Sequence, residues 1–118
     1  MRLLVTIIAL TVLAGPALAN GFQRIEDRDR FIGLVEGRDL TRFGISLKVT
    51  DGGQIAGSAF GQKVSGRWDW SGRYFCRDLY LGGKPLDTQN CQTVEVRGDT
   101  LRFTSDRGQG DSAELRLD

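Results

Sequence analysis

Residues 63–81 read KVSGRWDWSGRYFCRDLYL, and their pattern decides the fold class. Small or apolar residues recur at every second position of the first half: Val64, Gly66, Trp68 and Trp70. This alternation is typical of a β-strand with one face turned inward. Ser71-Gly72 is a turn signal, and residues 73–81 form a second strand candidate with aromatic side chains on both faces. The stretch therefore predicts an antiparallel hairpin.

The same pattern continues on both sides of this hairpin. Further strands are predicted at residues 43–49, 54–60, 92–97, 100–106 and 112–117. Turns rich in glycine and polar residues separate them, and the longest loop is expected at residues 82–90. The sequence thus predicts about seven or eight short strands between residues 40 and 117.

Short turns leave no room for parallel crossovers, so the sheet should be an antiparallel meander. Such a meander either closes into a small barrel or folds into a sandwich. We favour the barrel because closure removes exposed strand edges. Glycines predicted within strands suit the sharp bends of a small barrel: Gly57, Gly61 and Gly66. One short helix, at residues 27–36, is expected to cover an end of the barrel.

An export signal is predicted at residues 1–19. Arg2 supplies a positive start, residues 3–15 form an apolar run, and Ala17-Leu18-Ala19 places small residues at the cleavage positions. A transmembrane anchor would need about 20 apolar residues, which is more than this run provides. We therefore expect one β domain, residues 20–118, that is periplasmic or secreted and has no stable membrane anchor after cleavage.

The charges of the chain nearly cancel. It holds 16 Lys+Arg and 15 Asp+Glu, and removal of Arg2 with the signal leaves 15 of each sign. A near-neutral composition gives no electrostatic reason to expect binding to nucleic acid or to an anionic membrane.

Cys76 and Cys91 are the two cysteines of the chain. In an oxidising compartment such a pair is most simply a disulfide. A metal site is not expected, because the chain has no histidine to complete a thiolate site.

The absence of histidine also removes the common nucleophile pairs and zinc-protease motifs. We predict no catalytic residue and no cofactor, although a pair of carboxylates remains an enzymatic alternative. Residues 108–113, GQGDSA, match the dinucleotide pattern GxGxxA. That pattern needs a following helix and a second strand, whereas only five residues follow Ala113. We interpret the segment as a glycine-rich hairpin.

The most conspicuous cluster is Trp68 and Trp70. Both indoles fall on one strand face, where they form either core or an aromatic wall for an apolar ligand in the barrel mouth. Tyr74 on the next strand extends this wall in the second interpretation. Arg77 and Asp78 form either a structural ion pair or a polar anchor at the site. These five residues are the predicted ligand-binding set.

Several motifs resemble a family of small exported proteins of Gram-negative bacteria. They are GxWxW at residues 66–70, YFCRDL at 74–79, NCQ at 90–92, FTSDRGxG at 103–110 and DRDxFxxLVxG at 27–37. The resemblance covers nearly all of the predicted exported domain. It implies no established activity, although some members carry the label dihydrodipicolinate reductase. By that label, the chain would be a two-domain enzyme with a nucleotide-binding fold and a catalytic histidine. The residues here do not support the label, because the chain is short and has no histidine.

A more distant resemblance is to small periplasmic inhibitors of metalloproteases. These are also exported, one-disulfide barrels with a tryptophan-bearing strand, and their inhibitory part is the N-terminal segment. By that resemblance, residues 20–26 would be the inhibitory segment here.

The sequence therefore predicts an exported, non-catalytic barrel of unknown specificity. The expected partner is a small apolar ligand or another protein of the cell envelope. A protease inhibitor is the first alternative, and an enzyme of the kind named by the family label is the second.

Overall fold

The computed structural model describes residues 21–118, apart from the side chains of residues 87 and 88. The predicted signal at residues 1–19 lies outside this range. In the described part there are nine strands and two helices. They are β1 (Gln23–Arg24), α1 (Arg28–Val35), β2 (Leu40–Arg42), β3 (Ile45–Val49), β4 (Gln54–Ala59), β5 (Gln62–Ser71), β6 (Tyr74–Leu81), β7 (Lys84–Arg97), β8 (Thr100–Thr104), α2 (Ser105–Gly108) and β9 (Ser112–Leu117).

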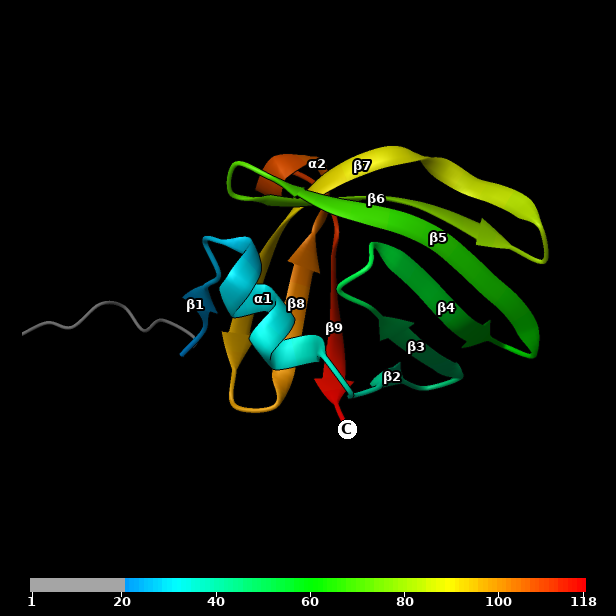
Figure 1. Cartoon of the computed structure of the whole chain (residues 1–118), viewed down its shortest axis with the longest axis horizontal. Coiled ribbons are helices and arrows are strands. Elements are labelled where there is room, and N and C mark those ends of the chain that lie inside the picture. The colour runs from blue at the N-terminus through cyan, green and yellow to red at the C-terminus, as the bar shows by residue number, and fades with distance from the viewer. Residues whose placement is uncertain (1–20) are drawn as a thin grey trace, which may run out of the picture.

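Strands β2 to β9 form an antiparallel barrel in which each strand pairs with the next along the chain. The barrel closes where β9 pairs with β2, with Leu40 opposite Leu117 (Figure 1). The predicted meander and its closure into a barrel are therefore confirmed, and the sandwich alternative is not adopted. Each strand turns alternate side chains inward, and these inward residues build the core.

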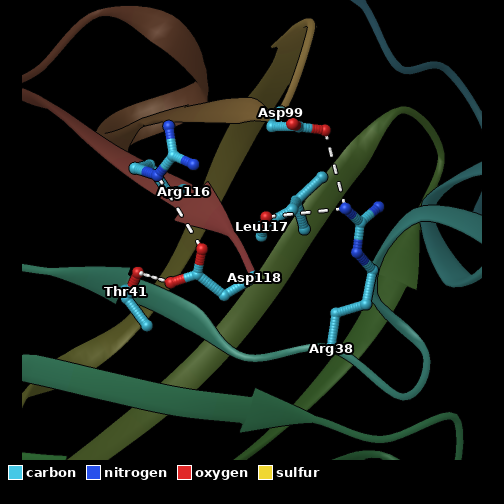
Figure 2. A network of polar contacts seen from close by, with 6 residues as sticks. All are labelled: Arg38, Thr41, Asp99, Arg116, Leu117 and Asp118. Carbon is cyan, nitrogen blue, oxygen red and sulfur yellow. Dashed lines mark hydrogen bonds and ion pairs between the residues drawn. The ribbon is translucent and has the colours of Figure 1, made fainter.

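A network of polar contacts surrounds the closing strand pair. Figure 2 shows its six residues: Arg38, Thr41, Asp99, Arg116, Leu117 and Asp118. The Thr41 hydroxyl donates to the Asp118 carboxylate at 2.6 Å, and Arg38 lies 3.5 Å from the carboxylate of Asp99. Exposed ion pairs of this kind contribute little to stability. Leu40 and Leu117, both 2% exposed, provide the apolar burial that favours closure.

Helix α1 contributes one aromatic side chain to the barrel interior. Asp27 caps the helix, because its carboxylate accepts a hydrogen bond from the Arg30 amide at 2.9 Å. Phe31 is fully buried, and its ring lies 5.0–6.4 Å from four other rings that belong to β5, β6 and β8. These rings are those of Trp68, Trp70, Phe75 and Phe103. This contact anchors α1 to three strands at once.

The strand predicted at residues 43–49 is shorter than expected. Residues 40–42 form a separate strand, β2, and the chain turns at Phe43-Gly44 before β3 begins. Gly44 has a φ of 77°, which a turn of this kind requires. Phe43, the first residue of the predicted strand, lies in this turn and is 92% exposed.

The sequence predicts a long loop at residues 82–90, and this prediction is wrong. Gly82 and Gly83 both have positive φ and form a two-residue turn, so that Leu81 pairs directly with Lys84. Residues 84–90 therefore belong to β7. The predicted disulfide between Cys76 and Cys91 is present, and it joins directly opposed residues of β6 and β7 rather than spanning a loop.

Two small elements escaped sequence prediction. Strand β1 has two residues and pairs with the end of β7 that extends past β6, with Gln23 opposite Val96. Helix α2 replaces the end of the strand predicted at residues 100–106, and Asp106 and Arg107 adopt left-handed backbone angles there. Such short elements carry too little periodicity to be recognised.

Two of the three glycines predicted for strand bends mark close backbone approaches. A Cβ atom at Gly57 would collide with the carbonyl oxygen of Ser46, and one at Gly66 with that of Asp78. Gly61 instead lies in the turn between β4 and β5.

We predict that Phe31→Ala lowers the free energy of unfolding by about 3–5 kcal/mol, because it leaves a cavity among four aromatic rings. Urea denaturation followed by circular dichroism measures this. Phe43→Ala is the matched control, and its effect should stay within about 0.5 kcal/mol because the Phe43 ring is exposed. Equal losses in the two variants would contradict this role of Phe31.

We predict that the double variant Cys76→Ala/Cys91→Ala loses about 3 kcal/mol of stability, the entropic contribution of a bond that closes a loop of 15 residues. The measurement is the denaturation midpoint with and without a reducing agent. Reductant should destabilise the parent protein and leave the double variant unchanged.

Candidate ligand-binding cavity

The barrel interior is filled in one part and hollow in another. Around Phe31 the aromatic rings pack against one another, whereas the adjoining part encloses a cavity of about 270 Å³. Ten of the described residues that line it are apolar: Leu40, Ile45, Leu47, Val49, Ile55, Phe75, Leu79, Phe103, Ala113 and Leu115. Period-two alternation in six strands turns these side chains inward.

The cavity extends from the core to the surface. Ile55 and Phe75, each 4% exposed, lie at its buried end. Ile45 and Leu79 are half-buried, and Arg42 is exposed. A ligand can therefore reach the apolar walls without unfolding of the barrel.

Six polar side chains also line the cavity. They are Arg42, Arg77, Gln92, Ser105, Asp111 and Ser112. Gln92 is 6% exposed, and its amide donates to the Ser105 hydroxyl at 3.1 Å, which fixes both side chains. Two arginines and one carboxylate are therefore among the described lining residues.

The two predicted tryptophans lie outside this cavity. Trp68 is 5% exposed, and its Nε1 donates to the Thr50 carbonyl oxygen at 2.9 Å. Its ring lies 5.3 Å from that of Phe31, as does the ring of Trp70. The structure therefore buries the Trp68 indole in the core and packs the half-buried Trp70 indole against it, which corresponds to the first of the two interpretations drawn from the sequence.

The other three predicted residues divide between the two sides of β6. Tyr74 lies outside the barrel between two guanidinium groups, 5.2 Å from that of Arg24 and 5.5 Å from that of Arg107. Asp78 is half-buried and is absent from the described lining residues. Arg77 lines the cavity, because it pairs with Trp68 at an inward-facing position. Only Arg77 of the five predicted residues belongs to this site.

Sequence reasoning missed Arg42 and the aliphatic walls. Leu40 and Arg42 alternate across Thr41, but three residues are too few to predict a strand. The strands predicted at residues 43–49 and 112–117 include the aliphatic residues of β3 and β9, and nothing in their spacing indicates that the space between them is unfilled. Cavities arise from the packing of distant segments, which periodicity does not report.

The segment proposed as inhibitory by resemblance is packed on the barrel as far as the structure describes it. Gln23–Arg24 form β1, and Ile25 is fully buried, with its amide donating to the Val94 carbonyl oxygen at 2.8 Å. At Glu26 a hydrogen bond from the Arg73 guanidinium, 2.7 Å long, lowers the pKa of the carboxyl group. Residues 21–26 therefore form part of the domain and lead into α1.

The glycine-rich segment at residues 108–113 runs from the end of α2 into β9, within the hairpin of β8 and β9, as expected. It continues directly into β9 (Ser112–Leu117), so no helix follows it that could bind a pyrophosphate group. Among the side chains that the structure describes, no three acidic or cysteine groups are close enough together to hold a metal ion. None of the helices described is long and apolar enough to cross a membrane.

Comparison of the chain with protein-family models, curated proteins and solved structures finds no match.

We predict that Trp68→Phe and Trp70→Phe differ in their cost. Trp68→Phe removes the hydrogen bond to Thr50 and should lower the free energy of unfolding by about 1–2 kcal/mol. The buried Nε1 of Trp70 has no hydrogen-bond partner among the described residues, so Trp70→Phe should cost less. Parallel urea titrations of the two variants decide this, and a larger loss for Trp70→Phe would contradict it.

Proposed function

We propose that this chain is an exported, non-catalytic barrel that binds a small, mainly apolar molecule carrying one anionic group. The observation that carries the proposal is the cavity of about 270 Å³, which has apolar walls and a rim that includes Arg42. Small-molecule sites are commonly of this type, with mostly apolar walls and a few polar groups that orient the ligand.

The volume of the cavity supports a small ligand. Typical sites for drug-sized molecules measure about 300–1,000 Å³, whereas an engineered cavity of about 150 Å³ holds benzene. The cavity here lies between these sizes. It therefore suits a molecule somewhat larger than a single aromatic ring.

The charge of the wall supports an anionic group on the ligand. Arg42 and Arg77 line the cavity together with one described carboxylate, that of Asp111. A guanidinium group can donate two parallel hydrogen bonds to a carboxylate, sulfonate or phosphate. Such a group at the rim would leave the apolar part of the ligand against the aliphatic walls.

Two observations support an extracytoplasmic location. The apolar run at residues 3–15 has the composition of a signal peptide. The disulfide between Cys76 and Cys91 is a bond that persists mainly outside the cytoplasm.

The test is a fluorescence titration with 8-anilinonaphthalene-1-sulfonate, which joins an apolar ring system to one sulfonate. We predict saturable binding with one site per chain. Ala113→Leu adds three carbons to a half-buried position on the wall. It should weaken binding at least tenfold, because the added carbons displace apolar parts of the ligand whose burial contributes to affinity. Arg42→Gln should weaken it about tenfold through loss of the charged hydrogen bonds.

Arg30→Gln is the matched control for charge, because Arg30 lies exposed on α1, away from the cavity lining. Each variant is first shown to unfold cooperatively, so that dye binding to a loosened core is recognised. If folded Ala113→Leu binds with unchanged affinity, the cavity is not the site and the proposal fails. If Ala113→Leu weakens binding but Arg42→Gln does not, Arg42 does not bind the anionic group of the ligand.

A further inference from the structure

Three hairpin tips lie together on one side of the barrel, away from α1 (Figure 1). They are the tips between β2 and β3 (residues 42–44), between β4 and β5 (residues 60–63) and between β6 and β7 (residues 81–86). We call these residues the tip surface. It is distinct from the cavity, with which it shares only Arg42 among the described lining residues.

Backbone contacts join the three tips into one surface. The Phe60 amide donates to the Gly44 carbonyl oxygen at 2.7 Å, and the Phe60 ring lies so close to Gly44 that a Cβ atom there would collide with it. The Gly82 amide donates to the Lys63 carbonyl oxygen at 2.8 Å. The backbones of the three tips are therefore hydrogen-bonded to one another in sequence.

Each tip exposes a large apolar side chain. Phe43 is 92% exposed, Phe60 66% and Leu86 54%. Phe60 has a φ of 51°, a left-handed conformation that disfavours a bulky side chain. A phenylalanine kept in a strained and exposed position is a sign of function rather than of packing.

Each tip also carries one basic residue. These are Arg42, Lys63 and Lys84, and the sequence has no acidic residue within residues 42–44, 60–63 or 81–86. The near-neutral composition of the chain conceals this, because the charge balance is a sum over all faces. The three tips thus carry three basic residues and no acidic residue of their own, which the composition of the whole chain does not indicate.

We propose that the tip surface docks reversibly on an anionic phospholipid membrane. Aromatic and aliphatic side chains would enter the headgroup boundary while the three cations contact lipid phosphates. A symmetric dimer through the same surface would bring like charges together, which disfavours a second copy as the occupant. This inference does not depend on the proposed ligand.

The test uses the mature chain, residues 20–118 with the disulfide formed, and two kinds of vesicle. One kind contains phosphatidylglycerol in phosphatidylcholine, and the other is phosphatidylcholine alone. Co-sedimentation should show binding to the anionic vesicles, a much weaker interaction with the neutral ones, and loss of binding at high salt. Equal binding to both vesicles, or none to the anionic ones, would overturn the proposal.

Variants separate the two contributions. Lys63→Glu/Lys84→Glu should lower the partition coefficient more than tenfold, since each basic residue near an anionic surface accounts for about fivefold. Phe43→Ser should lower it about tenfold by removing an inserting side chain. Arg30→Glu on α1 is the matched charge control and should change it less than twofold. A loss as large in Arg30→Glu would show a non-specific charge effect and overturn the assignment.

Two further measurements distinguish membrane docking of the tip surface from association of two chains. In Phe43→Trp, the new indole should shift its emission to the blue on addition of anionic vesicles, whereas Trp68 and Trp70 are already buried or half-buried. Sedimentation equilibrium without lipid should find a monomer. A dimer that Phe43→Ser dissociates would assign the tip surface to a second copy and contradict the proposal. Dye binding by Phe43→Ser should match the parent protein, which separates this test from that of the cavity.

Discussion

The ring of Phe31 packs against Trp68, Trp70, Phe75 and Phe103, and the rest of the domain is arranged around this contact. It links the one helix packed into the barrel to strands β5, β6 and β8. It also sets the limit of the cavity, because Phe75 and Phe103 touch Phe31 on one side and line the hollow part on the other. Aromatic pairs add directional stabilisation to the apolar area that they bury. Aromatic rings therefore lie at the buried end of the cavity, whereas most of its apolar wall is built from aliphatic side chains.

The division between aromatic and aliphatic halves explains how a small domain keeps a hollow interior. A barrel of this size buries little surface for its length, so an unfilled volume costs stability. Here the cost is offset by dense packing around Phe31 and by a disulfide on the outer side of β6 and β7. The polar residues of the cavity wall include Gln92, which is buried but satisfied by Ser105. Under the proposed function, a cavity with one fixed polar group suits selection of a ligand by shape and hydrogen bonding.

Much of the fold could be predicted from the sequence. The alternation through Val64, Trp68 and Trp70 indicated a strand with one face turned inward, and the short turns required an antiparallel meander. The candidate site was less predictable: Arg77 was predicted as a site residue and lines the cavity, whereas Arg42 lies on a strand too short to show a period. Phe43 was misassigned because its spacing continues the alternation of β3, although Gly44 turns the chain there. Local pattern reports which face a residue occupies, and only the assembled barrel shows whether the space beside it is filled.

The closure of the barrel has a consequence for its order of assembly. Thr41 and Asp118 meet although 77 positions separate them, whereas Cys76 and Cys91 face each other within one hairpin. Contacts between distant residues bear a larger loop entropy, so the hairpin of β6 and β7 should form well before β9 reaches β2. Until then, β2 and β9 are open edges available to other chains. Pairing of β9 with β2 is therefore the step that removes these open edges. Its rate sets how long a newly made chain remains prone to aggregation.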